Sequence, residues 1–160
     1  MRRTLAVALA ALIIPSLSVA SGTSLNACSL ISGKQSAALG VTKPCKATTL
    51  PSSFAVASAG NWGLPTSDAA SLSLTVTTFK STSNAAWQAS MSTLNLLPGK
   101  ATKVGGIGDR AYESGGDGGR LASIHFVKGK RVVSFSWYSK KPQTSLKAFN
   151  ADARSIAGQL

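Results

Sequence analysis

The sequence predicts an α+β fold, an antiparallel sheet packed by helices, and three patterns lead to it. Residues 72–76 alternate between apolar and small polar side chains, as in a strand with one buried face. Residues 121–127 and 131–138 alternate in the same way and are separated by three turn-forming residues, which predicts a hairpin. Residues 145–160 repeat apolar side chains at helical spacing. Sequential strands joined by tight turns make the sheet antiparallel.

The first half of the chain begins with a short helix. Ser32 and Gln35 fit the S-x-x-Q capping box that opens a helix, and Gly40 supplies its C-terminal stop. Two prolines bracket residues 44–51, and we expect this segment to be extended. Residues 54–59 form a short apolar run and are a second candidate strand.

The middle of the chain combines a turn with a second helix. Gly and Pro in residues 60–65 predict an irregular turn before the next strand, which should end near Phe79. The second helix is expected to begin at Ser83 or Asn84 and to end before Pro98. Its apolar stripe consists of Trp87, Met91 and Leu94.

Two glycine-rich turns divide the second half. Residues 104–109 predict a bend that leads into a short strand near Ala111 and Tyr112, and residues 115–119 predict a flexible turn. A final helix is expected to begin at Ser145 and to dock on the sheet. Its apolar face consists of Leu146, Phe149, Ala153, Ile156 and Leu160.

The N-terminus has the pattern of a secretory signal peptide. Arg2 and Arg3 precede an apolar run at residues 5–14, which is too short to cross a bilayer, where about 20 apolar residues are needed. Small residues then lead to a cleavage site between Ala20 and Ser21. The sequence therefore predicts residues 1–20 as signal peptide and residues 21–160 as a single domain, periplasmic or secreted.

Cys28 and Cys45 are the only cysteines of the chain. An even pair in an exported domain predicts one disulfide, since the compartment is oxidising. It would close a loop of about 18 residues, which the loop-entropy model values at about 3 kcal/mol. The alternative is a lipoprotein, because residues 25–28 resemble a lipobox and Cys28 would then carry the lipid.

The chain is strongly basic. It has 17 Lys and Arg against five Asp and Glu, and loss of the two signal-peptide arginines lowers the formal charge from +12 by two. Such an excess attracts anionic partners such as phospholipid headgroups, acidic polysaccharides or released DNA, or it serves solubility alone. No stacking aromatic is interleaved with the basic residues, so no specific nucleic-acid site is expected. The candidate anionic contacts are Lys128, Lys130, Arg131, Lys140 and Lys141.

Catalytic side chains are scarce. The single histidine, His125, lies in a predicted strand and faces away from its two apolar neighbours. A site of several histidines is thereby excluded, and we expect neither a metal nor a cofactor. A hydrolase would have to use Asp109, Glu113 or Asp117, which all belong to one bend-and-strand stretch.

Residues 106–111 match the dinucleotide-binding pattern G-x-G-x-x-A, but no helix follows them. We therefore interpret Gly106, Gly108 and Asp109 as a structural bend. The glycines would permit positive φ, and Asp109 would accept backbone N–H bonds or pair with Arg110.

The three tryptophans suggest different positions. Trp87 belongs to the helical stripe and Trp137 to the inner face of a strand, so both are expected in the core. Trp62 lies in the Gly/Pro-rich turn. It would either anchor that turn over the sheet or form an exposed contact for a ligand such as a sugar.

The chain resembles a loose group of exported bacterial domains with a PsbP/Mog1-like α+β sandwich. The resemblance is carried by residues 27–40, by residues 104–112, by a Lys-Gly turn between two strands and by the closing amphipathic helix. It implies an α+β fold and an envelope location, and it brings no catalytic residues. Many members look like lipoproteins, whereas this chain lacks a clear lipobox.

These patterns predict an exported, non-enzymatic binding domain that acts on an anionic envelope component or on a protein partner. The alternative is an inhibitor or immunity-type protein that blocks a secreted hydrolase with a rigid loop at residues 105–109 or 115–119. A hydrolase that uses the carboxylates named above is the third hypothesis.

Overall fold

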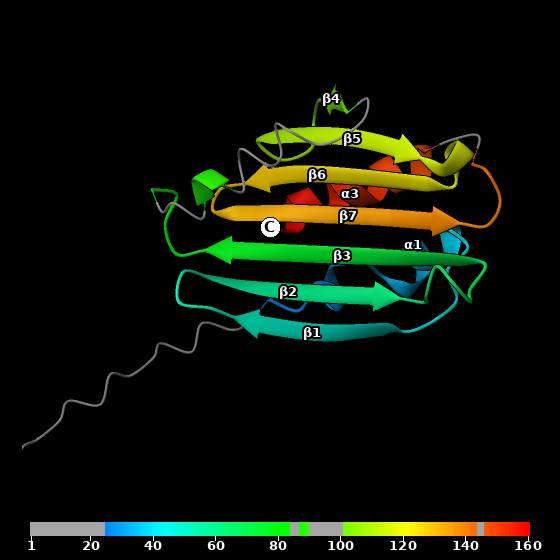
Figure 1. The fold of residues 1–160 in the computed structure, drawn as a ribbon, viewed down its shortest axis with the longest axis horizontal. Coiled ribbons are helices and arrows are strands. Elements are labelled where there is room, and N and C mark those ends of the chain that lie inside the picture. Colours follow the sequence, from blue (N-terminus) through cyan, green and yellow to red (C-terminus); the bar gives the residue numbers. More distant parts are fainter. Residues whose placement is uncertain (1–24, 84–86, 90–100, 144–145) are drawn as a thin grey trace, which may run out of the picture.

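The computed structural model describes residues 25–83, 87–89, 101–143 and 146–160. They form a seven-stranded antiparallel sheet in the order β1-β2-β3-β7-β6-β5-β4 (Figure 1). The strands are β1 (Cys45–Pro51), β2 (Ala55–Trp62), β3 (Ala70–Phe79), β4 (Thr102–Val104), β5 (Arg110–Gly116), β6 (Leu121–Lys128) and β7 (Arg131–Ser139). The helical elements are η1 (Ala27–Leu30), α1 (Gly33–Ala38), η2 (Asp117–Gly119) and α3 (Lys147–Gln159). The predicted α+β class is confirmed.

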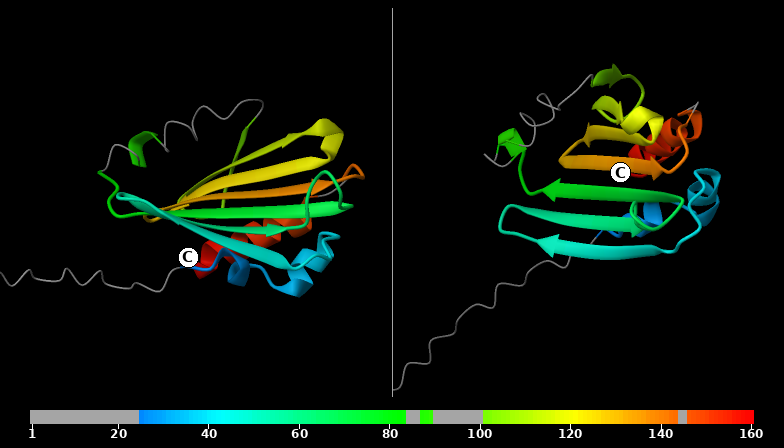
Figure 2. Two further views of the ribbon diagram at one scale, coloured as in Figure 1. Left: turned by 60° about the horizontal axis from the view of Figure 1, so that its bottom comes forward. Right: turned by 45° about the vertical axis from the view of Figure 1, so that its right-hand side comes forward.

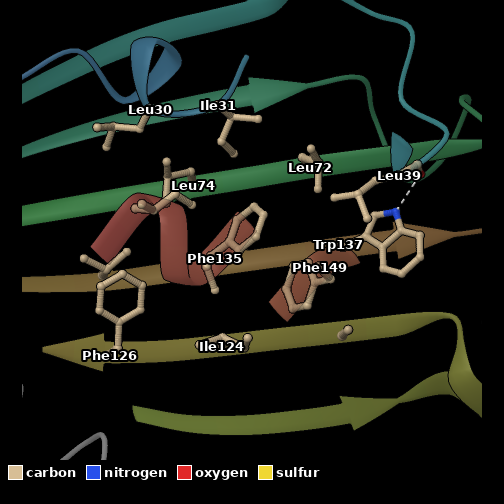
Figure 3. Close-up of a cluster of buried hydrophobic side chains, with 14 of the residues drawn as sticks. Leu30, Ile31, Leu39, Leu72, Leu74, Ile124, Phe126, Phe135, Trp137 and Phe149 are labelled. Carbon is tan, nitrogen blue, oxygen red and sulfur yellow. Dashed lines mark hydrogen bonds between the residues drawn. The ribbon is translucent and has the colours of Figure 1, made fainter. Parts of the chain in front are cut away.

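The C-terminal helix packs on one face of the sheet, and Figure 2 shows α1 and η1 on the same side. Phe149, Ala153 and Ile156 of α3 have no exposed surface, as the apolar stripe predicted. The ring of Phe149 stacks on Phe135 of β7 with centroids 4.5 Å apart, at the centre of the core (Figure 3). Burial of this stripe is what holds α3 to the sheet, because a 13-residue helix is only marginally stable alone.

The N-terminal segment contains the predicted capping box, helix-ending glycine and disulfide. The side chain of Ser32 accepts the backbone N–H of Gln35, the Gln35 side chain accepts that of Ser32, and Gly40 has a φ of 76°. The predicted disulfide joins Cys28, in η1, to Cys45, the first residue of β1, with a Cα separation of 5.7 Å. This bond connects the helical layer to the edge of the sheet.

The predicted hairpin is formed by β6 and β7, in which Lys128 pairs with Arg131. Ile124 and Phe126 of β6 and Val133 and Phe135 of β7 are all completely buried. Their alternation with half-buried residues explains why the sequence pattern identified these strands.

Three elements differ from the prediction. β2 extends through Trp62, so part of the predicted irregular turn at residues 60–65 is strand. β4 was not expected, and β5 continues to Gly116, into the predicted flexible turn. Of the predicted second helix, residues 87–89 are helical. Met91, Leu94, Pro98 and the predicted signal peptide lie outside the described residues.

The other face of the sheet is rich in small hydroxylated side chains. Ser123 and Ser136 oppose each other there, with their Oγ atoms 2.9 Å apart. Trp87 packs on one end of this face, its ring edge-on to Phe79 at 5.5 Å. Among the described residues, no helix has the length and apolar character needed to cross a membrane.

Candidate anion-binding site

The structure separates the two basic clusters that the sequence indicated. Lys128, Lys130 and Arg131 surround the β6–β7 turn, whereas Lys140 and Lys141 directly follow the other end of β7. Because a strand rises about 3.3 Å per residue, the nine residues of β7 place the clusters roughly 30 Å apart. They therefore lie at opposite ends of the sheet (Figure 1).

At the first end the fold adds Lys80, which follows the last residue of β3. Its Nζ donates to the carbonyl of Ser53 at 2.6 Å. The Nζ of Lys130 in turn donates to the carbonyl of Lys80 at 3.1 Å, and Lys128 Nζ lies 3.8 Å from the Asp109 carboxylate. We call Lys80, Lys128 and Lys130 the hairpin cluster. Hydrogen bonds to carbonyls position these ammonium groups without cancelling their charge.

The predicted structural bend supports this end. Asp109 accepts the backbone N–H of Gly129, the central residue of the turn, at 2.7 Å. The Asp109 N–H donates to the Val127 carbonyl at 2.7 Å, and Gly106 and Gly108 both have positive φ. A Cβ on Gly108 would lie 2.3 Å from the Val127 carbonyl oxygen, so only glycine fits there. The positive φ of Gly106 and Gly108 and the hydrogen bonds of Asp109 agree with a structural bend.

Arg131 has a different role from its lysine neighbours. It is half-buried, and its Nη1 donates to the carbonyl of Leu160 at the end of α3. Its Nε is buried, and the described residues provide no hydrogen-bond partner for it. Arg131 thus joins β7 to the last described residue of the helix, a role that the sequence did not indicate.

At the opposite end, Lys140 and Lys141 are joined by Lys43 and Lys46. These two lysines flank the disulfide-bonded Cys45 at the start of β1, and all four side chains belong to exposed residues. We call these four residues the distal cluster. Sequence analysis missed Lys43 and Lys46, because only the β1–β2–β3–β7 order brings the start of β1 to the same end of the sheet as the end of β7.

Two hollows open between the distal lysines. The first, of about 430 Å³, is lined by Lys43 and Lys46 together with the turn at residues 63–68. The second, of about 550 Å³, is lined by Lys140 and Lys141 together with the end of α1 and the start of β3. Ser67 connects the two, because it lines the first hollow while its carbonyl accepts from Lys140 Nζ at 3.1 Å.

One carboxylate lies among the distal lysines. Asp68 accepts the backbone N–H of Leu64 at 2.7 Å through Oδ2, which closes the turn at residues 63–68. Its Oδ1 lies 4.0 Å from Lys43 Nζ, at the limit of an ion pair. The end therefore keeps an excess of positive charge around its hollows.

Trp62 is not the exposed contact that we considered. Its side chain is 3% exposed and lies in the core, so the anchoring interpretation holds instead. A Cβ on Gly60 would lie 2.9 Å from Cys45 Sγ and 3.1 Å from the Trp62 ring, so the disulfide and the indole share the space above this glycine. Trp137 is also in the core, with its Nε1 donating to the Leu39 carbonyl at 3.0 Å (Figure 3).

Two of the three candidate hydrolase carboxylates, Asp109 and Glu113, make structural contacts, and the side chain of Asp117 lies outside the described residues. Glu113 faces the helical layer and accepts from Asn150 of α3 at 3.3 Å. Four residues of extended chain separate Asp109 from Glu113, or about 13 Å, which exceeds the spacing of a glycosidase pair. His125 lies on the hydroxylated face, and burial lowers its pKa below the ordinary value. The described residues contain no group of three potential metal ligands.

Comparison of the chain with family models, curated proteins and solved structures gave no match. The resemblance to PsbP/Mog1-like domains stays a prediction. Functional inference therefore depends on the geometry of the two basic ends.

Proposed function

We propose that the protein is an exported, non-enzymatic binding domain that attaches to an anionic component of the cell envelope through the distal cluster. The observation that carries this proposal is the convergence of four exposed lysines on two adjoining hollows. Two of them come from the start of the chain's first strand and two from the end of its last strand. Phosphate or carboxylate groups entering the hollows would meet cations from both sides.

The disulfide supports the same proposal. It fixes Cys45 between Lys43 and Lys46, so that these two lysines stay beside the turn at residues 63–68. A site assembled from segments far apart in the sequence needs such a constraint to keep its charges in place. Oxidation of the pair also agrees with an exported protein, and with Cys28 bonded its sulfur is not available for lipidation.

One of the two loops named in the inhibitor hypothesis, residues 105–109, receives little support from the structure, whereas Gly115, Gly118 and Gly119 of the other are exposed. Ile107 is 1% exposed and Gly108 packs against the Val127 carbonyl, so the bend at residues 105–109 lies on the sheet and does not project toward a partner. A stoichiometric enzyme recovered with the protein from a periplasmic extract would nevertheless favour that hypothesis over ours.

Retention on immobilised heparin tests the proposal. We compare Lys140→Gln/Lys141→Gln with Lys103→Gln/Arg154→Gln, a pair of exposed residues near the β4 edge that removes the same charge. Since each lysine near an anionic surface contributes about 1 kcal/mol, affinity at low salt should fall about 25-fold for the distal pair. The control pair should change it only a few-fold.

Wild-type retention should also weaken steeply as salt increases, because exposed charges are screened within about 10 Å at 0.1 M salt. Equal losses for the two double variants would show that net charge alone acts, and the distal site would then be wrong. Retention that does not depend on salt would contradict the electrostatic basis of the proposal.

A further inference from the structure

The exposed apolar side chains gather at the same two ends as the lysines. The large apolar residues that are clearly exposed among the described ones are Leu50, Phe54, Leu64 and Leu121. Leu64, 60% exposed, lines the first distal hollow with Lys43 and Lys46. Phe54, 42% exposed, lies in the β1–β2 turn, where its carbonyl accepts the backbone N–H of Lys80. Each basic cluster therefore has an apolar side chain beside it.

This combination is typical of surfaces that dock on lipid bilayers. Lysines are attracted to anionic headgroups, and a neighbouring apolar side chain gains free energy when it leaves water for the acyl boundary. A soluble polyanion such as heparin attracts the lysines but offers no apolar environment to the neighbouring apolar side chain. Leu64 and Phe54 are thus the residues that distinguish a bilayer from other anionic partners.

The ends are too far apart to act as one patch. Their separation of roughly 30 Å along β7 is nearly four Debye lengths, of about 8 Å each, at physiological salt, so each end attracts its own counter-charge. Between them the side chains of β7 are uncharged, from Val132 through Ser134 and Ser136 to Tyr138. A bilayer bound at one end leaves the other end pointing away from it.

We propose that the protein bridges two anionic phospholipid bilayers, docking on one through the distal cluster with Leu64 and on the other through the hairpin cluster with Phe54. This inference rests on the proposed function, because the distal contact is the same in both. The distal end forms the stronger contact, since its four lysines border hollows of about 430 and 550 Å³. At the hairpin end, Lys128 and Lys130 border a smaller hollow of about 340 Å³, and Lys80 and Lys130 are bound to backbone carbonyls.

The test uses protein purified after export and vesicles containing 30 mol% phosphatidylglycerol in phosphatidylcholine. Binding is measured by co-sedimentation and bridging by vesicle clustering in dynamic light scattering, at 0.1 M NaCl. Wild type should bind and cluster anionic vesicles and leave pure phosphatidylcholine vesicles unaffected. Lys80→Gln/Lys130→Gln should bind within about threefold of wild type but lose clustering. Lys103→Gln/Arg154→Gln, the charge-matched control, should keep both.

The apolar contacts of Leu64 and Phe54 are tested separately, by comparing vesicle binding and clustering with heparin retention. Leu64→Ser should lower vesicle binding about fivefold, as expected when a leucine is partly transferred from water. It should lower heparin retention far less, because the lysines around the hollow are unchanged. Phe54→Ser should reduce clustering and leave binding nearly intact.

Three results would overturn the inference. Binding without clustering by wild type would show that the protein contacts a single surface. Clustering that survives Lys80→Gln/Lys130→Gln would assign bridging to self-association of the protein. Salt-dependent heparin retention without vesicle binding would leave the anion-binding proposal standing while excluding bilayers. Absence of heparin retention, in contrast, would remove the proposed function itself.

Discussion

The two ends of the sheet have similar charge but hold it differently. At the hairpin end, Lys80 and Lys130 are hydrogen-bonded to backbone carbonyls, and Lys128 faces Asp109. The supporting bend is packed so tightly that Gly108 admits no side chain. The lysines there are part of the structure that closes the hairpin, and their charge is a fixed array on a rigid turn.

At the distal end, the lysines border more open volume than at the hairpin end, where Lys128, Lys130 and Arg131 line one hollow of about 340 Å³. Lys43, Lys46, Lys140 and Lys141 surround two hollows of about 430 and 550 Å³, and only Lys140 donates its Nζ to a carbonyl among the bonds described here. The disulfide constrains the backbone on which two of these side chains stand. The comparison teaches that similar charge does not mean equal affinity, because affinity depends on how much room a cation has for a ligand and on how firmly it is already bound.

The largest expected effect on stability comes from a substitution at the rigid hairpin end. Gly108→Ala places a Cβ 2.3 Å from the Val127 carbonyl at a φ of 57°, so the bend must shift. We expect a loss of about 3 kcal/mol in the free energy of unfolding, or about 10 °C in Tm, measured by thermal denaturation. Gly105→Ala is the control, because nothing lies within 4 Å of its Cβ position and its effect should be near zero. Equal effects of the two substitutions would contradict the packing described for this bend.

The next largest expected effect on stability comes from removing the disulfide at the distal end. Cys28→Ser/Cys45→Ser should cost about 3 kcal/mol in denaturant unfolding, because the unfolded chain is no longer constrained. Charge is unchanged, so any loss of heparin retention would come from the displaced lysines Lys43 and Lys46. Thiol titration of the wild type in denaturant should find no free thiols. Two free thiols, or unchanged stability of the double variant, would contradict the role of the bond.

Much of this framework could be predicted from the sequence, because local patterns encode it. Alternation identified β3, β6 and β7, a capping box identified α1, and two cysteines in a chain with a predicted signal peptide identified the bond. These signals act within a few residues or depend on counting alone.

What the sequence could not provide was strand order. β4 has only three residues and too little alternation to be recognised. Gly60 suggested a turn, but it lies within β2. A glycine is needed at this strand position because Cys45 Sγ and the Trp62 ring occupy the space where a side chain would lie. Lys43 and Lys46 could be added to the distal cluster only when the sheet order was known. Contacts between distant segments leave no periodic pattern in the sequence. The sequence therefore identified Lys140 and Lys141 of the distal cluster but not Lys43 and Lys46.

A smaller effect concerns the helical layer beneath the distal end. Asp152 of α3 is 7% exposed, and its Oδ1 accepts from Gln35 of α1 at 3.0 Å, while its Oδ2 is buried with no partner among the described residues. Burial raises the pKa of Asp152 above the ordinary 3.8, against the lowering effect of the Gln35 bond. The folded state therefore binds this proton more tightly than the unfolded state does. Stability from this group should decrease as the pH rises from about 3.8 through the raised pKa.

Asp152→Asn should remove that dependence. The amide oxygen can still accept from Gln35, so at pH 7 the variant should be more stable by a modest amount, below about 1 kcal/mol. The measurement is the free energy of unfolding in urea between pH 3.5 and 7, for wild type and variant together. A variant whose pH profile parallels that of the wild type would show that Asp152 does not titrate in this range.

The smallest effect on stability separates the two ends most directly. Lys130→Ala removes the hydrogen bond to the Lys80 carbonyl at 3.1 Å, whereas Lys141→Ala removes a side chain with no such bond to a described residue. We expect Lys130→Ala to lower the free energy of unfolding by about 0.5 kcal/mol and Lys141→Ala to leave it within about 0.2 kcal/mol, by urea unfolding. Heparin affinity should show the opposite order, with Lys141→Ala losing about fivefold and Lys130→Ala less. If one substitution had the larger effect on both stability and affinity, the distinction between a rigid, weaker-binding end and an open, stronger-binding end would be wrong.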